Sequence, residues 1–93
     1  MDEKKKIENV FTWIDEMFPE HDMINLDGYE DCIVGVVTRF GAEPILCYDR
    51  DKVIEKKMTE GNVDYETALE DFEFNMIGGW FGETTPCFLE KTQ

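Results

Sequence analysis

The chain opens with a helical pattern of apolar residues that ends at a proline. Apolar side chains recur at spacings of three and four residues, the periodicity of one buried helix face. Glu3 to Phe18 is therefore predicted to be a helix. Pro19 ends it, because proline lacks the backbone N–H that a continuing helix needs. The stripe consists of Ile7, Val10, Phe11, Ile14, Met17 and Phe18.

Two segments with strand-like composition follow a polar stretch. Residues 31–40, DCIVGVVTRF, are rich in β-branched residues and apolar at both odd and even positions. This pattern predicts a central strand that is covered on both faces. Residues 41–44 are a predicted turn, and residues 45–48 a second strand. The two strands would form a β-hairpin with a loop of about four residues.

The second half predicts two capped helices. Asp49 is a predicted N-cap for a helix from Arg50 to Met58, which Gly61 ends. Asp64 is the predicted N-cap of the next helix. That helix carries apolar residues at helical spacing, namely Tyr65, Ala68, Leu69, Phe72 and Met76.

A short apolar run, PCFLE at residues 86–90, closes the chain as a third predicted strand. The order α-β-β-α-α-β predicts an α+β fold in which a small antiparallel sheet packs against helices. Ninety-three residues, 1–93, are expected to form a single domain, because two cores do not fit in this length. No apolar run approaches the roughly 20 residues of a membrane helix, and no signal-peptide pattern opens the chain. We therefore expect a cytoplasmic protein without membrane contact.

Acidic charge dominates the composition, with a net charge of −13. Nucleic acid and anionic membranes reward Lys and Arg, so direct binding to either is not expected, whereas a basic protein partner suits this charge. The charge is uneven: residues 20–31 and residues 62–74 each hold five acidic residues and no Lys or Arg. Residues 50–57 hold four basic and two acidic residues.

Within the second acidic block, Glu66, Glu70 and Glu73 fall at positions i, i+4 and i+7 of the predicted helix. Neighbouring positions on such a face lie roughly 5–6 Å apart at Cβ, which is of the order of phosphate spacing along a nucleic-acid strand. These three residues are therefore predicted to bind a Lys/Arg-rich protein in the manner of a DNA mimic. The alternative is a solvated face that only keeps the protein in solution.

A glycine-rich stretch, FEFNMIGGWFGETTP at residues 72–86, surrounds Trp80 and Phe81. A phosphate-binding loop is not expected here, because its glycines would have to precede a helix, and these follow one. The stretch is either the corner between a helix and a strand or a partner-binding tip. Since aromatic residues dominate binding hot spots, Trp80 and Phe81 are predicted partner-binding residues.

The residue types give little indication of a catalytic function. Cys32, Cys47 and Cys87 lack metal-ligand spacing and are expected to be reduced thiols. The chain contains one histidine and no serine, so a nucleophile paired with a base is not predicted. Asp27, Glu30 and Asp31 are the residues that a small metal-dependent enzyme would use. We expect no enzyme, no catalytic residue, no cofactor and no metal site.

Three stretches resemble a family of small proteins encoded by tailed phages and prophages. They are DGYEDCIVGV, CYDRDKVIEKKM and ALEDFEFNMIGGWFGETTP, followed by a closing Phe, and they cover roughly residues 27–89. No activity is established for that family, so the resemblance implies no catalytic role. It implies a phage context and a location in the host cytoplasm.

The sequence therefore predicts an acidic accessory protein of phage type that acts by protein–protein binding. In its sharpest form, it inhibits a basic nucleic-acid-handling protein of the host or of a defence system. A structural protein that forms a homo-oligomer is the first alternative. The small metal-dependent enzyme is the second.

Overall fold

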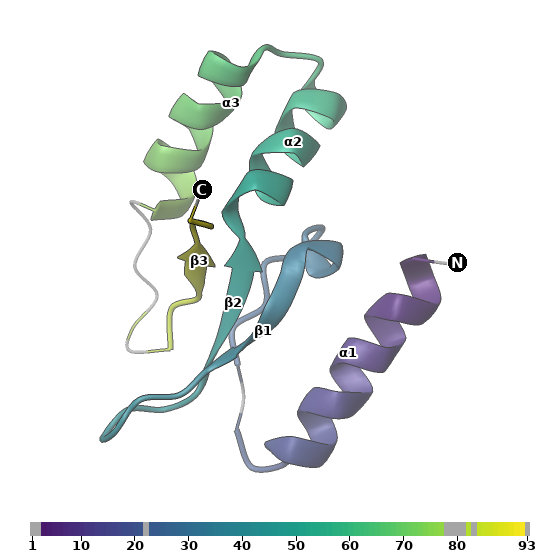
Figure 1. Ribbon diagram of the computed structural model, residues 1–93, viewed down its shortest axis with the longest axis vertical. Coiled ribbons are helices and arrows are strands. Elements are labelled where there is room, and N and C mark those ends of the chain that lie inside the picture. Colours follow the sequence, from purple (N-terminus) through teal and green to yellow (C-terminus); the bar gives the residue numbers. More distant parts are fainter. Residues whose placement is uncertain (1–2, 22, 78–81, 83, 93) are drawn as a thin grey trace.

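The computed structural model describes residues 3–21, 23–77, 82 and 84–92 (Figure 1). The predicted order α-β-β-α-α-β is confirmed, and the fold class is α+β. A short 3-10 turn, η1, precedes the first strand, and a π-helical turn, η2, follows the third helix. The elements are α1 (Glu3–Met17), η1 (Glu30–Cys32), β1 (Ile33–Val37), β2 (Ile45–Asp49), α2 (Arg50–Gly61), α3 (Tyr65–Phe72), η2 (Glu73–Ile77) and β3 (Cys87–Leu89).

The three strands form one mixed sheet in the order β1-β2-β3. β1 and β2 are antiparallel, as the predicted hairpin requires, and their register pairs Val37 with Ile45. β3 runs parallel to β2, with Cys47 opposite Cys87. The expectation of a wholly antiparallel sheet is therefore wrong for β3. The reason is that α2 and α3 form a crossover that brings the chain back to β2 in the same direction (Figure 1).

The central strand of the sheet is β2, and β1 lies at an edge. The expectation of a central strand at residues 31–40 is therefore wrong. Val34 and Val37 on β1 are exposed, whereas Leu46 to Asp49 on β2 are buried. The difference arises because β3 pairs with β2, which leaves one side of β1 without a neighbouring strand among the described strands. The connection between β1 and β2, residues 38–44, is also longer than the predicted four-residue loop.

Helix ends follow the predicted capping chemistry closely. The Asp49 carboxylate accepts hydrogen bonds from the backbone N–H groups of Asp51 and Lys52 and so caps α2. Asn62, rather than Gly61, is the residue that ends α2 in the left-handed conformation, with φ of 51°. Gly61 is instead the last residue of the helix.

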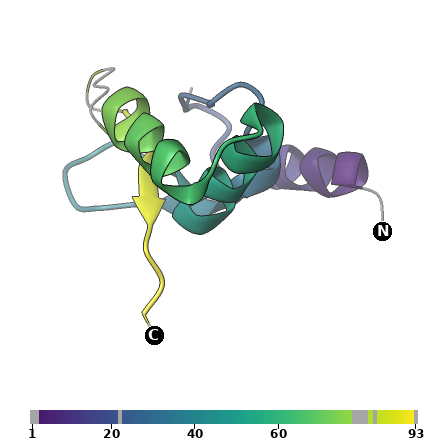
Figure 2. The same cartoon turned by 90° about the horizontal axis from the view of Figure 1, so that it is seen from above.

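The core lies where α2 and α3, side by side, meet β2 (Figures 1 and 2). Its fully buried side chains are Cys32, Leu46, Tyr48, Val53, Ile54 and Phe72. α1 lies on the β1 side and adds Ile14, with Val10 and Phe11 partly buried beside it. Among the described helices, none has the length and apolar composition to span a bilayer.

Candidate functional site

The N-terminus of α3 is capped by an aspartate side chain. Asp64 Oδ1 accepts a hydrogen bond of 2.9 Å from the backbone N–H of Thr67, which fixes the first turn. Ala68 and Phe72 are buried on the inner side of the helix. Because these two residues are four positions apart, they lie on one face and hold α3 against the core. Leu69 is partly buried beside them, whereas Glu70 and Asp71 are exposed.

All three predicted carboxylates, Glu66, Glu70 and Glu73, are exposed. None of them takes part in the ion pairs found among the described residues. Glu70 and Glu73 lie close together at an open hollow of about 700 Å³, and Glu66 lies one turn earlier. The hollow is lined by Thr67, Glu70, Asp71, Glu73 and Phe74.

Phe74 is an aromatic residue at this surface that the sequence pattern did not indicate. Its side chain is 82% exposed, although it follows the fully buried Phe72 by only two positions. It lies in the π-helical turn Glu73–Ile77 that continues α3. The available signal was an apolar residue off the helical stripe, directly after Glu73. Such π-helical turns are frequent at functional sites.

The chemistry of this surface suits a cation with an apolar stem. Carboxylates accept charge-assisted hydrogen bonds from Lys and Arg, and an aromatic ring attracts the same groups through its face. Glu70, Glu73 and Phe74 supply both kinds of group around one hollow. We define these three residues, together with Glu66, as the acidic–aromatic face of α3, which continues into the π-helical turn η2 with Glu73 and Phe74.

Asp71, beside this face, has a structural role. Its Oδ2 atom lies 2.5 Å from Lys57 Nζ on α2, and its Oδ1 accepts a hydrogen bond of 2.5 Å from the Asn75 side chain. The Lys57 ammonium, and then the Asn75 amide, hold the pKa of Asp71 below its usual range. Asp71 therefore joins α3 to α2, and its carboxylate is already paired with the Lys57 ammonium.

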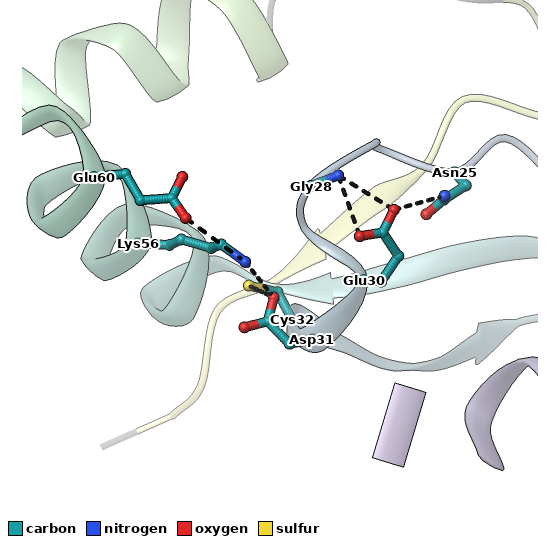
Figure 3. A network of polar contacts seen from close by, with 7 residues as sticks. All are labelled: Asn25, Gly28, Glu30, Asp31, Cys32, Lys56 and Glu60. Atoms are coloured by element: carbon teal, nitrogen blue, oxygen red, sulfur yellow. Dashed lines mark hydrogen bonds and ion pairs between the residues drawn. The ribbon is translucent and has the colours of Figure 1, made fainter. Parts of the chain in front are cut away.

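The first acidic block, residues 20–31, is partly used inside the protein (Figure 3). Glu30 accepts hydrogen bonds from the Asn25 side chain at 3.0 Å and from the backbone N–H of Gly28 at 3.1 Å. Asp31 Oδ1 instead accepts one of 2.8 Å from Lys56 Nζ on α2. These two carboxylates close a loop and attach it to a helix, so they are not free for a partner.

The positions of these side chains also show whether the candidate metal ligands could bind one ion together. Glu30 and Asp31 point to opposite sides of their turn, toward different partners (Figure 3). Within the described part of the chain, no three His, Cys, Asp or Glu side chains are grouped as a metal ion would need. The structure thus does not bring Asp27, Glu30 and Asp31 together as a metal-binding set.

The remaining candidate residues lie elsewhere in the chain. Trp80 and Phe81 lie outside the described residues. The three cysteines are free thiols, as expected. His21 Nδ1 lies 2.7 Å from an oxygen of Glu43, at exposed positions of the surface.

Comparisons with known proteins do not add an identity. No protein-family model, no curated protein and no solved structure matches this chain.

Proposed function

We propose that this chain is a small acidic accessory protein of phage type that acts in the host cytoplasm by protein–protein binding. The acidic–aromatic face of α3 binds a basic surface on a nucleic-acid-handling protein of the host or of a defence system. Occupying that surface would exclude nucleic acid and so inhibit the partner. The proposed role is non-catalytic, and it involves no direct binding to nucleic acid, since the net charge of −13 repels phosphate.

The observation that carries the proposal is a set of carboxylates without a cation beside an exposed ring. Glu66, Glu70 and Glu73 are exposed and outside the described ion pairs, and the exposed Phe74 lines one hollow with Glu70 and Glu73. Like charges at this spacing cost a helix a few tenths of a kcal/mol per pair. A basic partner would convert that repulsion into attraction, and the ring would add an apolar anchor. Trp80 and Phe81 stay predicted anchors.

The test compares three immobilised baits in a bacterial lysate at low and high salt. The first is the natural chain, and the second carries Glu66→Lys, Glu70→Lys and Glu73→Lys. We expect the natural chain to capture a basic nucleic-acid-handling protein at low salt and release it at high salt, because exposed charges are screened. The charge-reversed bait should lose at least tenfold of the captured partner. Duplex DNA should compete with the natural bait.

The third bait is a matched control, with Glu8→Lys, Glu16→Lys and Glu20→Lys. These residues are also exposed, so the control changes net charge equally but leaves α3 intact. It should keep most of the captured partner, and both variants should melt within a few degrees of the natural chain. Equal capture by the charge-reversed and natural baits would contradict the proposal. So would equal loss in both variants, since net charge alone would then explain binding.

Self-assembly is the second candidate, and a different surface favours it. β1 is an edge strand with exposed Val34 and Val37, and Phe40 in the following loop is fully exposed, at 104%. Exposed apolar edge strands pair readily with other chains. Sedimentation across a wide concentration range distinguishes this candidate. A mass that rises with concentration supports a homo-oligomer, and a constant monomer mass excludes it.

A further inference from the structure

Two of the three cysteines are direct neighbours across the parallel strands. Cys47 on β2 and Cys87 on β3 are register partners. Register partners project from the same face of a sheet, and adjacent strands lie about 4.8 Å apart. That spacing falls within the Cα separation of roughly 4.4–6.8 Å that a disulfide requires. The strand pairing therefore sets the two cysteine backbones at a separation that a disulfide can bridge.

We propose that Cys47 and Cys87 form a reversible disulfide that ties β3 to β2, with a small-molecule disulfide such as oxidised glutathione as the oxidant. The structure contains the reduced form, in which both thiols are free. A cytoplasmic glutathione pool favours this form, so the bond would form under oxidising conditions. The proposal is independent of partner binding.

The two cysteines have different roles in the thiol–disulfide exchange with oxidised glutathione. Burial, together with the neighbouring Cys87 thiol, raises the pKa of Cys47 to about 11, which makes Cys47 a poor first nucleophile. Cys87 is only half-buried, so it meets the oxidant first. Its sulfur attacks oxidised glutathione, forms a mixed disulfide and releases one glutathione thiol. The Cys47 sulfur then attacks the Cys87 sulfur and releases the second glutathione, which takes up the Cys47 proton.

The bond would secure the weakest strand of the sheet. β3 is only three residues long, and its Phe88 ring packs edge-on against Phe72 of α3 at 4.9 Å. A link between Cys47 and Cys87 closes a loop of roughly 40 residues that contains α2 and α3, and closing so long a loop restricts the unfolded chain. Oxidation would therefore fix β3, and with it the inner side of α3.

Cys32 supplies an internal control. It lies in η1, is 2% exposed, and its thiol donates a hydrogen bond to Asp31 at 3.7 Å. It is therefore expected to stay reduced while the other two cysteines are linked.

The experiment incubates the folded chain with excess oxidised glutathione, alkylates the remaining thiols after denaturation, and maps the peptides by mass spectrometry. We expect the loss of two hydrogens in mass, one alkylated cysteine at Cys32, and a linked peptide pair carrying Cys47 and Cys87. The melting temperature should rise by on the order of 10 °C and fall back on reduction. Cys32→Ser should keep the bond, and Cys87→Ser should abolish it.

Cys47→Ala provides a second variant without the bond, and alanine is chosen because it places no hydroxyl at this buried position. Three alkylated cysteines in the natural chain would overturn the proposal. A bond that involves Cys32, a bond between two chains, or a stable glutathione adduct on Cys87 would overturn it equally. A lower melting temperature after oxidation would contradict the tethering of β3.

Discussion

α2 and the outer face of α3 carry their charges in opposite ways. On α2, Lys56 and Lys57 are largely shielded and each holds a carboxylate from another element, Asp31 and Asp71. On the outer face of α3, Glu66, Glu70 and Glu73 are exposed and take no part in the ion pairs of the described residues. Lys56 and Lys57 therefore help to hold the fold, whereas the three glutamates are presented to solvent.

A count of acidic residues therefore does not locate a binding surface. The two acidic blocks are equal in the sequence, but Glu30 and Asp31 in the first serve the loop and α2. In the second block, Glu70 and Glu73 lie together at one hollow and outside the ion pairs of the described residues. Pairing inside the fold decides which charges are free for a partner.

The largest expected effect separates the two sides of α3. Phe72→Ala empties a fully buried site beside Phe88 and should lower the free energy of unfolding by about 3–5 kcal/mol. Phe74→Ala removes an exposed ring and should change stability by about 0.5 kcal/mol or less. Partner capture should nevertheless fall at least tenfold for Phe74→Ala. Urea unfolding and capture on the same samples test both statements.

Equal destabilisation by the two phenylalanine substitutions would mean that Phe74 packs into the core. In that case the division of α3 into an inner and an outer side would be wrong.

A smaller effect is expected at the helix caps. Asp49 is buried, caps α2 and lies 2.9 Å from Lys91 Nζ, whereas Asp64 caps α3 at the surface. Asp49→Ala should cost about 1–2 kcal/mol, since the cap and the ion pair are lost together. Asp64→Ala should cost less. Thermal melts of both variants, with Asp49→Asn as the variant that keeps the capping oxygen, provide the measurement.

The cap at Asp49 also predicts a pH dependence. Burial pushes the pKa of Asp49 upward, but Lys91 and the backbone N–H groups of Lys52 and Asp51 hold it below its usual range. Its contribution is therefore complete above the unfolded pKa of about 4 and is lost as the pH falls through the folded value. Melting temperatures from pH 7 to pH 3 should fall less steeply for Asp49→Asn than for the natural chain. Parallel curves would rule out this contribution.

The smallest effect compares two neighbours on α3. Asp71→Asn removes the carboxylate that faces Lys57 and should cost about 1 kcal/mol, because a largely buried ammonium loses its partner. Glu70→Gln removes a carboxylate outside the described ion pairs and should leave stability within about 0.5 kcal/mol. Capture of the partner should show the reverse order. If Glu70→Gln destabilised the fold as much as Asp71→Asn, the outer face would not be free.

Local signals in the sequence predicted most of the elements. The stripe that ends at Pro19 and the two aspartate caps act within a few residues, so α1, α2 and α3 lie close to their expected positions. Sheet order depends on where β3 returns, and no local pattern specifies that; the edge position of β1 and the parallel pairing of β3 were therefore missed.

The sequence also predicted part of the candidate site. Helical spacing alone identified Glu66, Glu70 and Glu73 as one exposed set. The exposure of Phe74 depends on the change to a π-helical turn after Phe72, which the periodicity of an α-helix does not anticipate. The internal pairing of Glu30 and Asp31 depends on contacts with Asn25 and Lys56, and the latter is distant in sequence.

Amide chemical-shift mapping can show whether the acidic–aromatic face is the surface that binds the partner. The labelled chain is titrated with the basic protein that the natural bait captures at low salt. We predict that the largest changes fall at Glu66, Glu70, Glu73 and Phe74, and that they weaken as salt is added. Large changes confined to β1 and the loop around Phe40, with α3 unaffected, would contradict it.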